Sequence, residues 1–116
     1  MTAISIEYTE TFERQVSACS QYLARYIGQS QARGLIFNFI DMLEQRVIRY
    51  PESSPLCEEA ADLGFTNYRD FILPDQQFRA IYRLEEEKAY MMLFLKSRQS
   101  IRRRSYNIVC GLSNEI

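Results

Sequence analysis

The sequence contains no histidine and no tryptophan among its 116 residues. Histidine is the side chain best suited to proton transfer near neutral pH, and it is the commonest zinc ligand. Its absence excludes histidine-based catalysis and histidine zinc sites. The three cysteines, Cys19, Cys57 and Cys110, are widely spaced and odd in number, which fits neither a disulfide framework nor a paired-cysteine metal site. We therefore predict reduced thiols, with no metal and no other cofactor.

Long apolar runs are missing as well. No stretch approaches the roughly 20 apolar residues that a membrane-spanning helix needs, and the opening "MTAISIEYTE" lacks the basic and apolar parts of a secretory signal. We expect a cytoplasmic protein that does not bind membranes. The length predicts one domain over residues 1–116, and a content of 47% apolar and 25% charged residues is that of an ordinary globular protein.

Positive charge is unevenly distributed along a chain whose formal net charge is −1. Residues 1–62 carry five arginines against nine acidic residues, whereas residues 63–116 carry nine basic residues against six acidic ones. Because the whole chain is slightly acidic, bulk attraction to nucleic acid should be weak. Any anion site must therefore come from a local cluster in the second half.

The first half predicts a short strand and a helical hairpin. The sequence "AISIEY" alternates apolar and polar side chains, as a strand does. Thr9 or Thr11 can cap a helix that ends at Gly28, and a second amphipathic helix is stopped by Pro51. Few residues join the two helices, so they should be antiparallel neighbours. Tyr22 and Tyr26 lie on or beside the apolar stripe of the first helix and suit packing or a partner contact.

The second half changes to the period of strands. After a long connection, "PESSPLCEEAADLGF", with room for one helical turn at "EEAADL", come three strand candidates: "NYRDFIL", "FRAIYRLE" and "AYMMLFL". Ser100 can then cap a short helix. The order β-α-α-β-β-β-α predicts an α+β fold in which an antiparallel helical hairpin packs on one face of a small, mostly antiparallel sheet.

The middle strand of this sheet should separate apolar from basic side chains. Phe78 and Tyr82 alternate with Arg79 and Arg83, so if the aromatic side chains face the helices, the arginines face the opposite, partly open surface. Basic residues of the neighbouring strands could converge with them. We predict an anion-binding or target-binding surface formed by Arg69, Arg79, Arg83, Lys96 and Arg98.

At this point the sequence resembles a known family. "YRDFIL", followed by "FRAIYRLEEEKAYMMLFL" and "SRQSIRRRSY", is similar to the RelE/ParE toxins of bacterial type II toxin–antitoxin systems. The segment "YPESSP" also resembles members described as plasmid stabilisation proteins. The resemblance spans nearly the whole chain in element order. It implies a RelE/ParE-like fold, inhibition of bacterial growth, and neutralisation by an antitoxin encoded beside the toxin.

The resemblance implies one of two targets. RelE-like members cut messenger RNA on the ribosome without a metal, and ParE-like members act on DNA gyrase. In the RNA-cutting branch an arginine of the middle strand clamps phosphate, and Arg79 occupies the matching position. A second arginine just after the last strand matches Arg98, and a C-terminal tyrosine matches Tyr106. These three are the candidate catalytic residues if the protein is a ribonuclease.

One departure from the family pattern favours the gyrase branch. RNA-cutting relatives supply lysines or histidines for proton transfer, but the strand "NYRDFIL" offers Arg69 and Asp70. Arginine retains its proton and serves poorly as a general base, and the alternation with Arg69 places Asp70 on the face away from Arg79. We therefore favour a ParE-like toxin. A ribosome-dependent ribonuclease and a non-catalytic binding protein on the same scaffold are the alternatives.

Each basic feature also has an interpretation without function. Arg79 and Arg98 could pair with nearby acidic residues on a solvated surface, and the run "RRR" at 102–104 points in three directions on a helix. The partner expected from the residues is an antitoxin segment that is disordered alone, carries acidic and apolar side chains, and orders on the basic sheet face. The sequence also allows a homodimer formed through the wide apolar face of the second helix.

Overall fold

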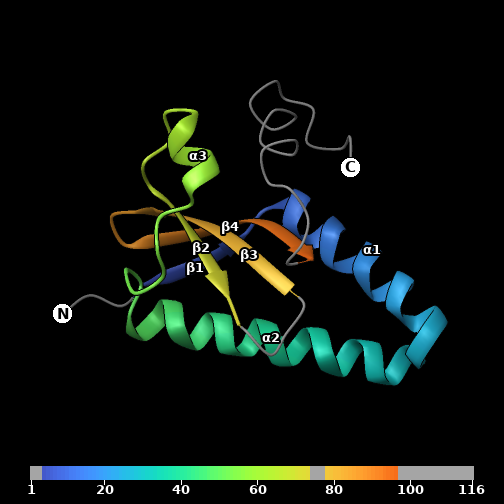
Figure 1. Cartoon of the computed structure of the whole chain (residues 1–116). Helices are drawn as coiled ribbons and strands as arrows, with labels where there is room; N and C mark the ends of the chain where they lie inside the picture. The colour runs from blue at the N-terminus through green and yellow to red at the C-terminus, as the bar shows by residue number, and fades with distance from the viewer. Residues whose placement is uncertain (1–3, 74–77, 97–116) are drawn as a thin grey trace.

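The computed structural model describes residues 4–73 and 78–96. Its elements are β1 (Ser5–Tyr8), α1 (Glu10–Ile27), α2 (Gln29–Arg49), α3 (Glu58–Asp62), β2 (Tyr68–Ile72), β3 (Phe78–Glu85) and β4 (Lys88–Lys96) (Figure 1). The strands form one sheet in the order β1-β4-β3-β2, antiparallel except that β1 runs parallel to β4. The predicted α+β fold is confirmed. The helix predicted after Ser100 lies outside the described residues.

Thr9 begins α1 and also joins it to the sheet. Its hydroxyl oxygen accepts a hydrogen bond from the backbone N–H of Phe12 at 3.2 Å and donates one to the carbonyl of Met91 at 2.7 Å. Glu10 and Glu13 lie in the first turn, where negative charge interacts favourably with the helix dipole. The Thr9 side chain therefore both caps α1 and ties its N-terminus to β4, beside the backbone bond from the Thr9 N–H to the same Met91 carbonyl.

Gly28 alone connects the two long helices. Its N–H donates to Ala24 at 3.1 Å to close α1, and its carbonyl accepts from Ala32 at 3.0 Å to open α2. Its backbone angles, φ +89° and ψ 155°, fall in a region that residues with a Cβ rarely adopt. The turn is therefore shorter than the sequence predicts, and it depends on glycine.

Two glycines near this turn should respond oppositely to alanine. Gly28→Ala forces a Cβ into a strained backbone conformation and should lower the free energy of unfolding by about 1–3 kcal/mol. Gly34 lies within α2, and apart from the backbone of its own helix no atom lies within 4 Å of the place a Cβ would take, so Gly34→Ala should raise the free energy of unfolding by about 0.5–1 kcal/mol. Urea denaturation followed by circular dichroism measures both changes. Shifts of the same sign would contradict this description of the turn.

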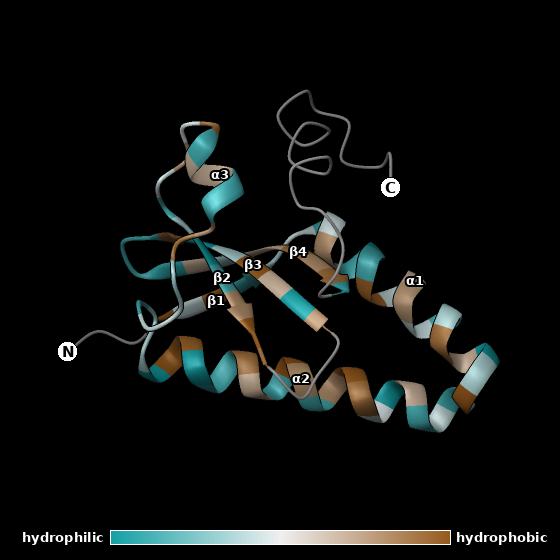
Figure 2. Cartoon of the chain, viewed as in Figure 1, coloured by the Kyte–Doolittle hydropathy of each residue, from teal (hydrophilic) through white to brown (hydrophobic). Residues whose placement is uncertain are grey.

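Both long helices cover one face of the sheet, where an aromatic cluster forms the main core. Phe39 of α2 is fully buried, with its ring centroid 5.4–5.8 Å from those of Phe71, Phe78 and Phe94. Figure 2 shows hydrophobic and hydrophilic bands alternating along α2, as expected of a helix with one buried face. Phe78 and Tyr82 belong to this core and so face the helices, which is the condition under which Arg79 and Arg83 are expected on the opposite face.

The opposite face of the sheet is partly covered by α3, which lies across the sheet from α2 (Figure 1). A smaller core joins Cys57 and Ala60 to Ile81, Leu93 and Leu95. The connection before α3 also extends the sheet, because the N–H of Asp70 donates to Pro55 and that of Cys57 donates to Tyr68, both at 2.9 Å. The prediction that Arg79 faces an open surface is therefore wrong: its exposed fraction is 8%.

A β-bulge changes which side chains of β4 face the helices. The pairing of β3 with β4 shifts between Ile81, which opposes Leu93, and Tyr82, which opposes Met91. Met91 and Phe94 consequently face the same helices although they are an odd number of residues apart. Beside the bulge, the side-chain oxygen of Gln15 accepts the N–H of Phe94 at 2.8 Å.

Within the part of the chain that the structure describes, no helix is long and apolar enough to cross a membrane.

Candidate functional site

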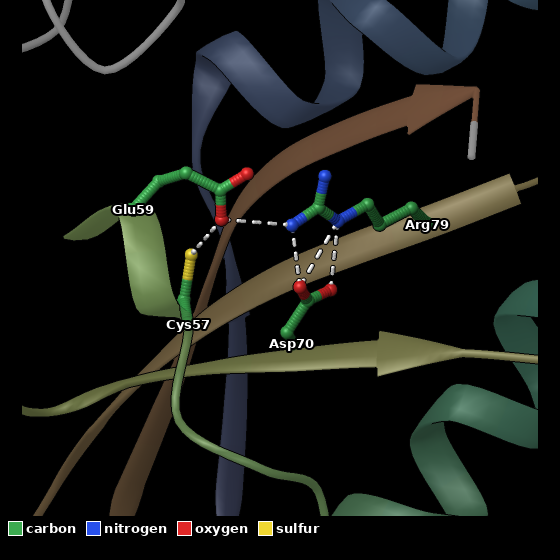
Figure 3. A network of polar contacts seen from close by, with 4 residues as sticks. All are labelled: Cys57, Glu59, Asp70 and Arg79. Atoms are coloured by element: carbon green, nitrogen blue, oxygen red, sulfur yellow. Dashed lines mark hydrogen bonds and ion pairs between the residues drawn. The ribbon is translucent and has the colours of Figure 1, made fainter. Parts of the chain in front are cut away.

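The clearest polar site of the described residues surrounds Arg79 of β3, beneath α3. The Nε of Arg79 donates to both carboxylate oxygens of Asp70, at 2.9 and 3.0 Å, and one terminal nitrogen approaches Asp70 at 2.5 Å and Glu59 at 3.2 Å (Figure 3). The thiol of Cys57 lies 3.8 Å from the same oxygen of Glu59. We call Cys57, Glu59, Asp70 and Arg79 the Arg79 network.

Strand pairing explains why Asp70 reaches Arg79. In the register of β2 with β3, Asp70 opposes Ile81 and Ile72 opposes Arg79, so Asp70 and Arg79 lie on the same face of the sheet. The prediction that Asp70 points away from Arg79 is wrong. Arg69 and Asp70 do lie on opposite faces of β2, but it is Arg69 that faces the helices, opposite Tyr82. Without the register, the sequence alone does not show which side chain of the pair shares a face with Arg79.

The network gives Arg79 a fully charged and closely held guanidinium. Hydrogen bonds with Asp70 raise the pKa of Arg79 above its ordinary value, against the opposing effect of burial. Its side chain is 9% exposed and that of Asp70 11%, whereas that of Glu59 is 24% exposed. An incoming phosphate would have to replace carboxylates that already occupy the guanidinium fork, and separating buried ion pairs is costly.

The same cluster contains the residue types that bind metals, but the guanidinium of Arg79 already lies among them. Ligand atoms of Cys57, Glu59 and Asp70 lie within 4.8 Å of one another, and the guanidinium of Arg79 is bonded to both carboxylates. Burial raises the pKa of the Cys57 thiol, which disfavours the thiolate that binds metals. These residues therefore fit an ion-pair network better than a metal ligand set.

Two members of the predicted basic surface lie on the other face. Arg69 opposes Tyr82 and donates to the backbone carbonyls of Glu52 at 3.3 Å and Ser54 at 2.9 Å. Lys96 opposes Phe78, and its ammonium lies 3.7 Å from the centroid of the Tyr22 ring on α1. The prediction that Arg69 and Lys96 converge with Arg79 is wrong.

Arg83 shares the face of Arg79 but has its own partners. Its guanidinium lies 4.3 Å from the centroid of the Tyr90 ring and forms an ion pair with Glu85. Arg98 and Tyr106 lie outside the described residues, so their roles stay predictions. The structure thus places Arg79 and Arg83 on one face and does not unite the predicted set into one basic surface.

One member of the Arg79 network was missed by sequence reasoning. Glu59 has no sequence signal beyond lying in an acidic turn, because its role depends on where α3 packs. Away from the network, Tyr22 and Tyr26 of α1 are the pair for which the sequence suggests packing or a partner contact. Their ring centroids are 5.2 Å apart, and 43% and 70% of their surfaces are exposed. The spacing of Gln15, Cys19, Tyr22 and Tyr26 places all four on one helical stripe, which the sequence alone shows.

Comparisons with known proteins support the fold through structure alone. No protein-family model matches the chain, and no curated protein matches it. A solved structure described as the chromosomal ParDE TA system from P. aeruginosa matches with a TM-score of 0.60 and 13% sequence identity, covering 80% of this chain and 95% of that chain. The RelE/ParE-like fold expected from the resemblance is thereby confirmed.

Proposed function

We propose that this chain is the growth-inhibiting toxin of a type II toxin–antitoxin pair, that an antitoxin encoded beside it neutralises it, and that its target is DNA gyrase. The fold shared with a chain of a ParDE system supports a toxin, as does the resemblance of the strands "YRDFIL" and "FRAIYRLE" to the RelE/ParE toxins. A role in plasmid stabilisation follows from the same assignment. The toxin would meet its target in the cytoplasm.

One observation carries the choice of gyrase over messenger RNA: the guanidinium of Arg79 is occupied by Asp70 and Glu59. A metal-independent ribonuclease needs a free phosphate clamp beside a group that transfers protons. The sequence has two lysines, and neither is beside Arg79. Lys88 pairs with Glu7 of β1, and Lys96 lies on the opposite face against α1.

Expression of the protein alone tests the proposal. Growth should stop on induction while cellular messenger RNA stays intact on northern blots, and the purified protein should inhibit supercoiling by purified gyrase. Coexpression of the adjacent open reading frame should restore growth and supplies the control for unspecific effects of overproduction.

Other outcomes would identify the alternatives. Cleaved transcripts together with normal supercoiling would overturn the gyrase target, and loss of that cleavage in Arg98→Ala would then assign a ribonuclease. Unimpeded growth without the adjacent gene product would contradict a toxin and favour a non-catalytic binding protein.

A further inference from the structure

One helical stripe of α1 is covered by the sheet at Gln15 and Cys19 and ends in two exposed tyrosines at the outer end of the helix. Gln15 contacts β4 through Phe94, and Cys19 packs against the main core. Further along the same stripe, Tyr22 and Tyr26 are exposed. Figure 1 shows the end of the helical hairpin reaching past the sheet. The stripe therefore continues beyond the strands that cover its beginning.

Positive charge surrounds these tyrosines, and acidic residues are absent from the surrounding helical segment. Residues 14–40 contain three arginines and no aspartate or glutamate. Arg25 follows Tyr22 by three residues and so neighbours it on the helix surface, and Lys96 lies on the ring of Tyr22. The ion pairs among the described residues do not include Arg25. We call Tyr22, Arg25, Tyr26 and Lys96 the α1 patch.

This composition fits a protein segment that carries carboxylates and apolar side chains. Tyrosine and arginine are the residues that most often dominate binding energy at protein interfaces, and charge complementarity selects the partner. A second copy of this chain fits poorly, because a two-fold interface at this patch would bring Arg25 and Lys96 close to their own copies.

Single-stranded nucleic acid is also a weaker fit. Bases stack on open aromatic faces, but the Lys96 ammonium already lies 3.7 Å from the Tyr22 ring centroid. The rings of Tyr22 and Tyr26 are inclined at 57° to each other, which does not make a flat platform. The chain as a whole carries a formal charge of −1, so long-range attraction to phosphates is small.

We infer that the α1 patch docks an acidic, partly apolar segment of the antitoxin, an assignment that rests on the proposed function. A carboxylate of that segment pairs with Arg25, while its apolar side chains cover Tyr22 and Tyr26. This moves the antitoxin surface from the sheet face, where α3 and the Arg79 network lie, to the outer end of the hairpin.

The chain offers a matched control, because the sequence Arg-Tyr occurs at the C-terminal end of both long helices. Tyr26 is 70% exposed within the α1 patch, and Tyr50 is 64% exposed at the far end of α2. We expect Arg25→Glu with Tyr26→Ala to raise the Kd for the purified product of the adjacent open reading frame at least about tenfold. Arg49→Glu with Tyr50→Ala should change it less than about twofold. Circular dichroism checks that both variants remain folded, and titration calorimetry measures the Kd.

The outcomes separate this assignment from the proposed function. Failure of the wild-type chain to bind the adjacent gene product would overturn the toxin–antitoxin proposal and the docking assignment with it. Binding by the wild type that both double variants retain would overturn the docking assignment alone. Unchanged affinity in the patch variant, combined with loss of homodimerisation or of binding to a single-stranded oligonucleotide, would assign the patch to that other partner instead.

Discussion

Replacement of Arg79 by alanine should lower the free energy of unfolding by about 3–5 kcal/mol, because it leaves the buried carboxylate of Asp70 without its cation. Asp70 loses every hydrogen bond it receives from the guanidinium, and Glu59 loses its ion pair. The change also removes the ion pair between α3 and β3, although the apolar contacts of the smaller core remain. A loss of this size would be a large part of the total stability of a small domain.

Arg83 provides the matched control on the same strand and the same face. Its side chain is 26% exposed and its partner Glu85 47% exposed, so Arg83→Ala should cost about 1 kcal/mol or less. Urea denaturation of the two variants measures the difference. Equal losses would show that the Arg79 network contributes no more than a surface ion pair.

A second variant distinguishes an unpaired charge from lost packing. Arg79→Met combined with Asp70→Leu removes both buried charges and retains side-chain volume, and it should recover much of the stability that Arg79→Ala loses. Glu59, whose side chain is 24% exposed, can then turn toward water. Failure of the double variant to exceed Arg79→Ala in stability would contradict the electrostatic explanation.

The network also affects how activity data should be interpreted. Loss of toxicity in Arg79→Ala would not identify Arg79 as a target-binding residue, because the same change destabilises the fold around α3. Arg83 is a better choice for a test of target binding, because its partners, Glu85 and Tyr90, lie outside the Arg79 network. Activity of the Arg79→Met and Asp70→Leu double variant would show directly that the guanidinium is structural.

Local chemistry made several elements predictable from the sequence. The bounds predicted for β3 agree with those observed, because strand residues are flanked by turn residues on both sides. Gly28 ends α1, Thr9 begins it, and the helical turn proposed within "EEAADL" is α3. The bounds of these elements depend on residues that are close in sequence, and capping residues and hydrophobic periodicity indicate such local structure.

Features that depend on tertiary packing were not predictable in the same way. The position of α3 on the sheet decides that Arg79 is buried, and nothing within the helix specifies it. The register of β2 decides which of Arg69 and Asp70 meets Arg79, and a shift of one residue would exchange them. Lys96 lies over Tyr22 because α1 crosses the end of β4. The prediction of one basic surface was therefore wrong because strand alternation alone does not show which side chains of neighbouring strands share a face.

The second large loss of stability is expected from the main core, on the face of β2 and β3 opposite the Arg79 network. Phe71 and Phe78, which contact Phe39, are adjacent in sequence to Asp70 and Arg79. Phe39→Ala should lower the free energy of unfolding by about 3–5 kcal/mol, through lost burial and the cavity that remains. Phe37, two residues away on α2 and 55% exposed, is the matched control; Phe37→Ala should cost about 0.5 kcal/mol or less.

The two faces should also be energetically coupled. A cavity beneath Phe71 and Phe78 lets β2 and β3 shift relative to each other, and the bond between Asp70 and Arg79 spans those strands at 2.9 Å. In a double-mutant cycle, Phe39→Ala and Arg79→Ala should therefore depart from additivity by about 0.5 kcal/mol or more. Cycles of Phe37→Ala with Arg79→Ala should be additive. Additivity in both cycles would mean that the core and the Arg79 network stabilise the sheet independently, so that the network could be altered for functional tests without loosening the core.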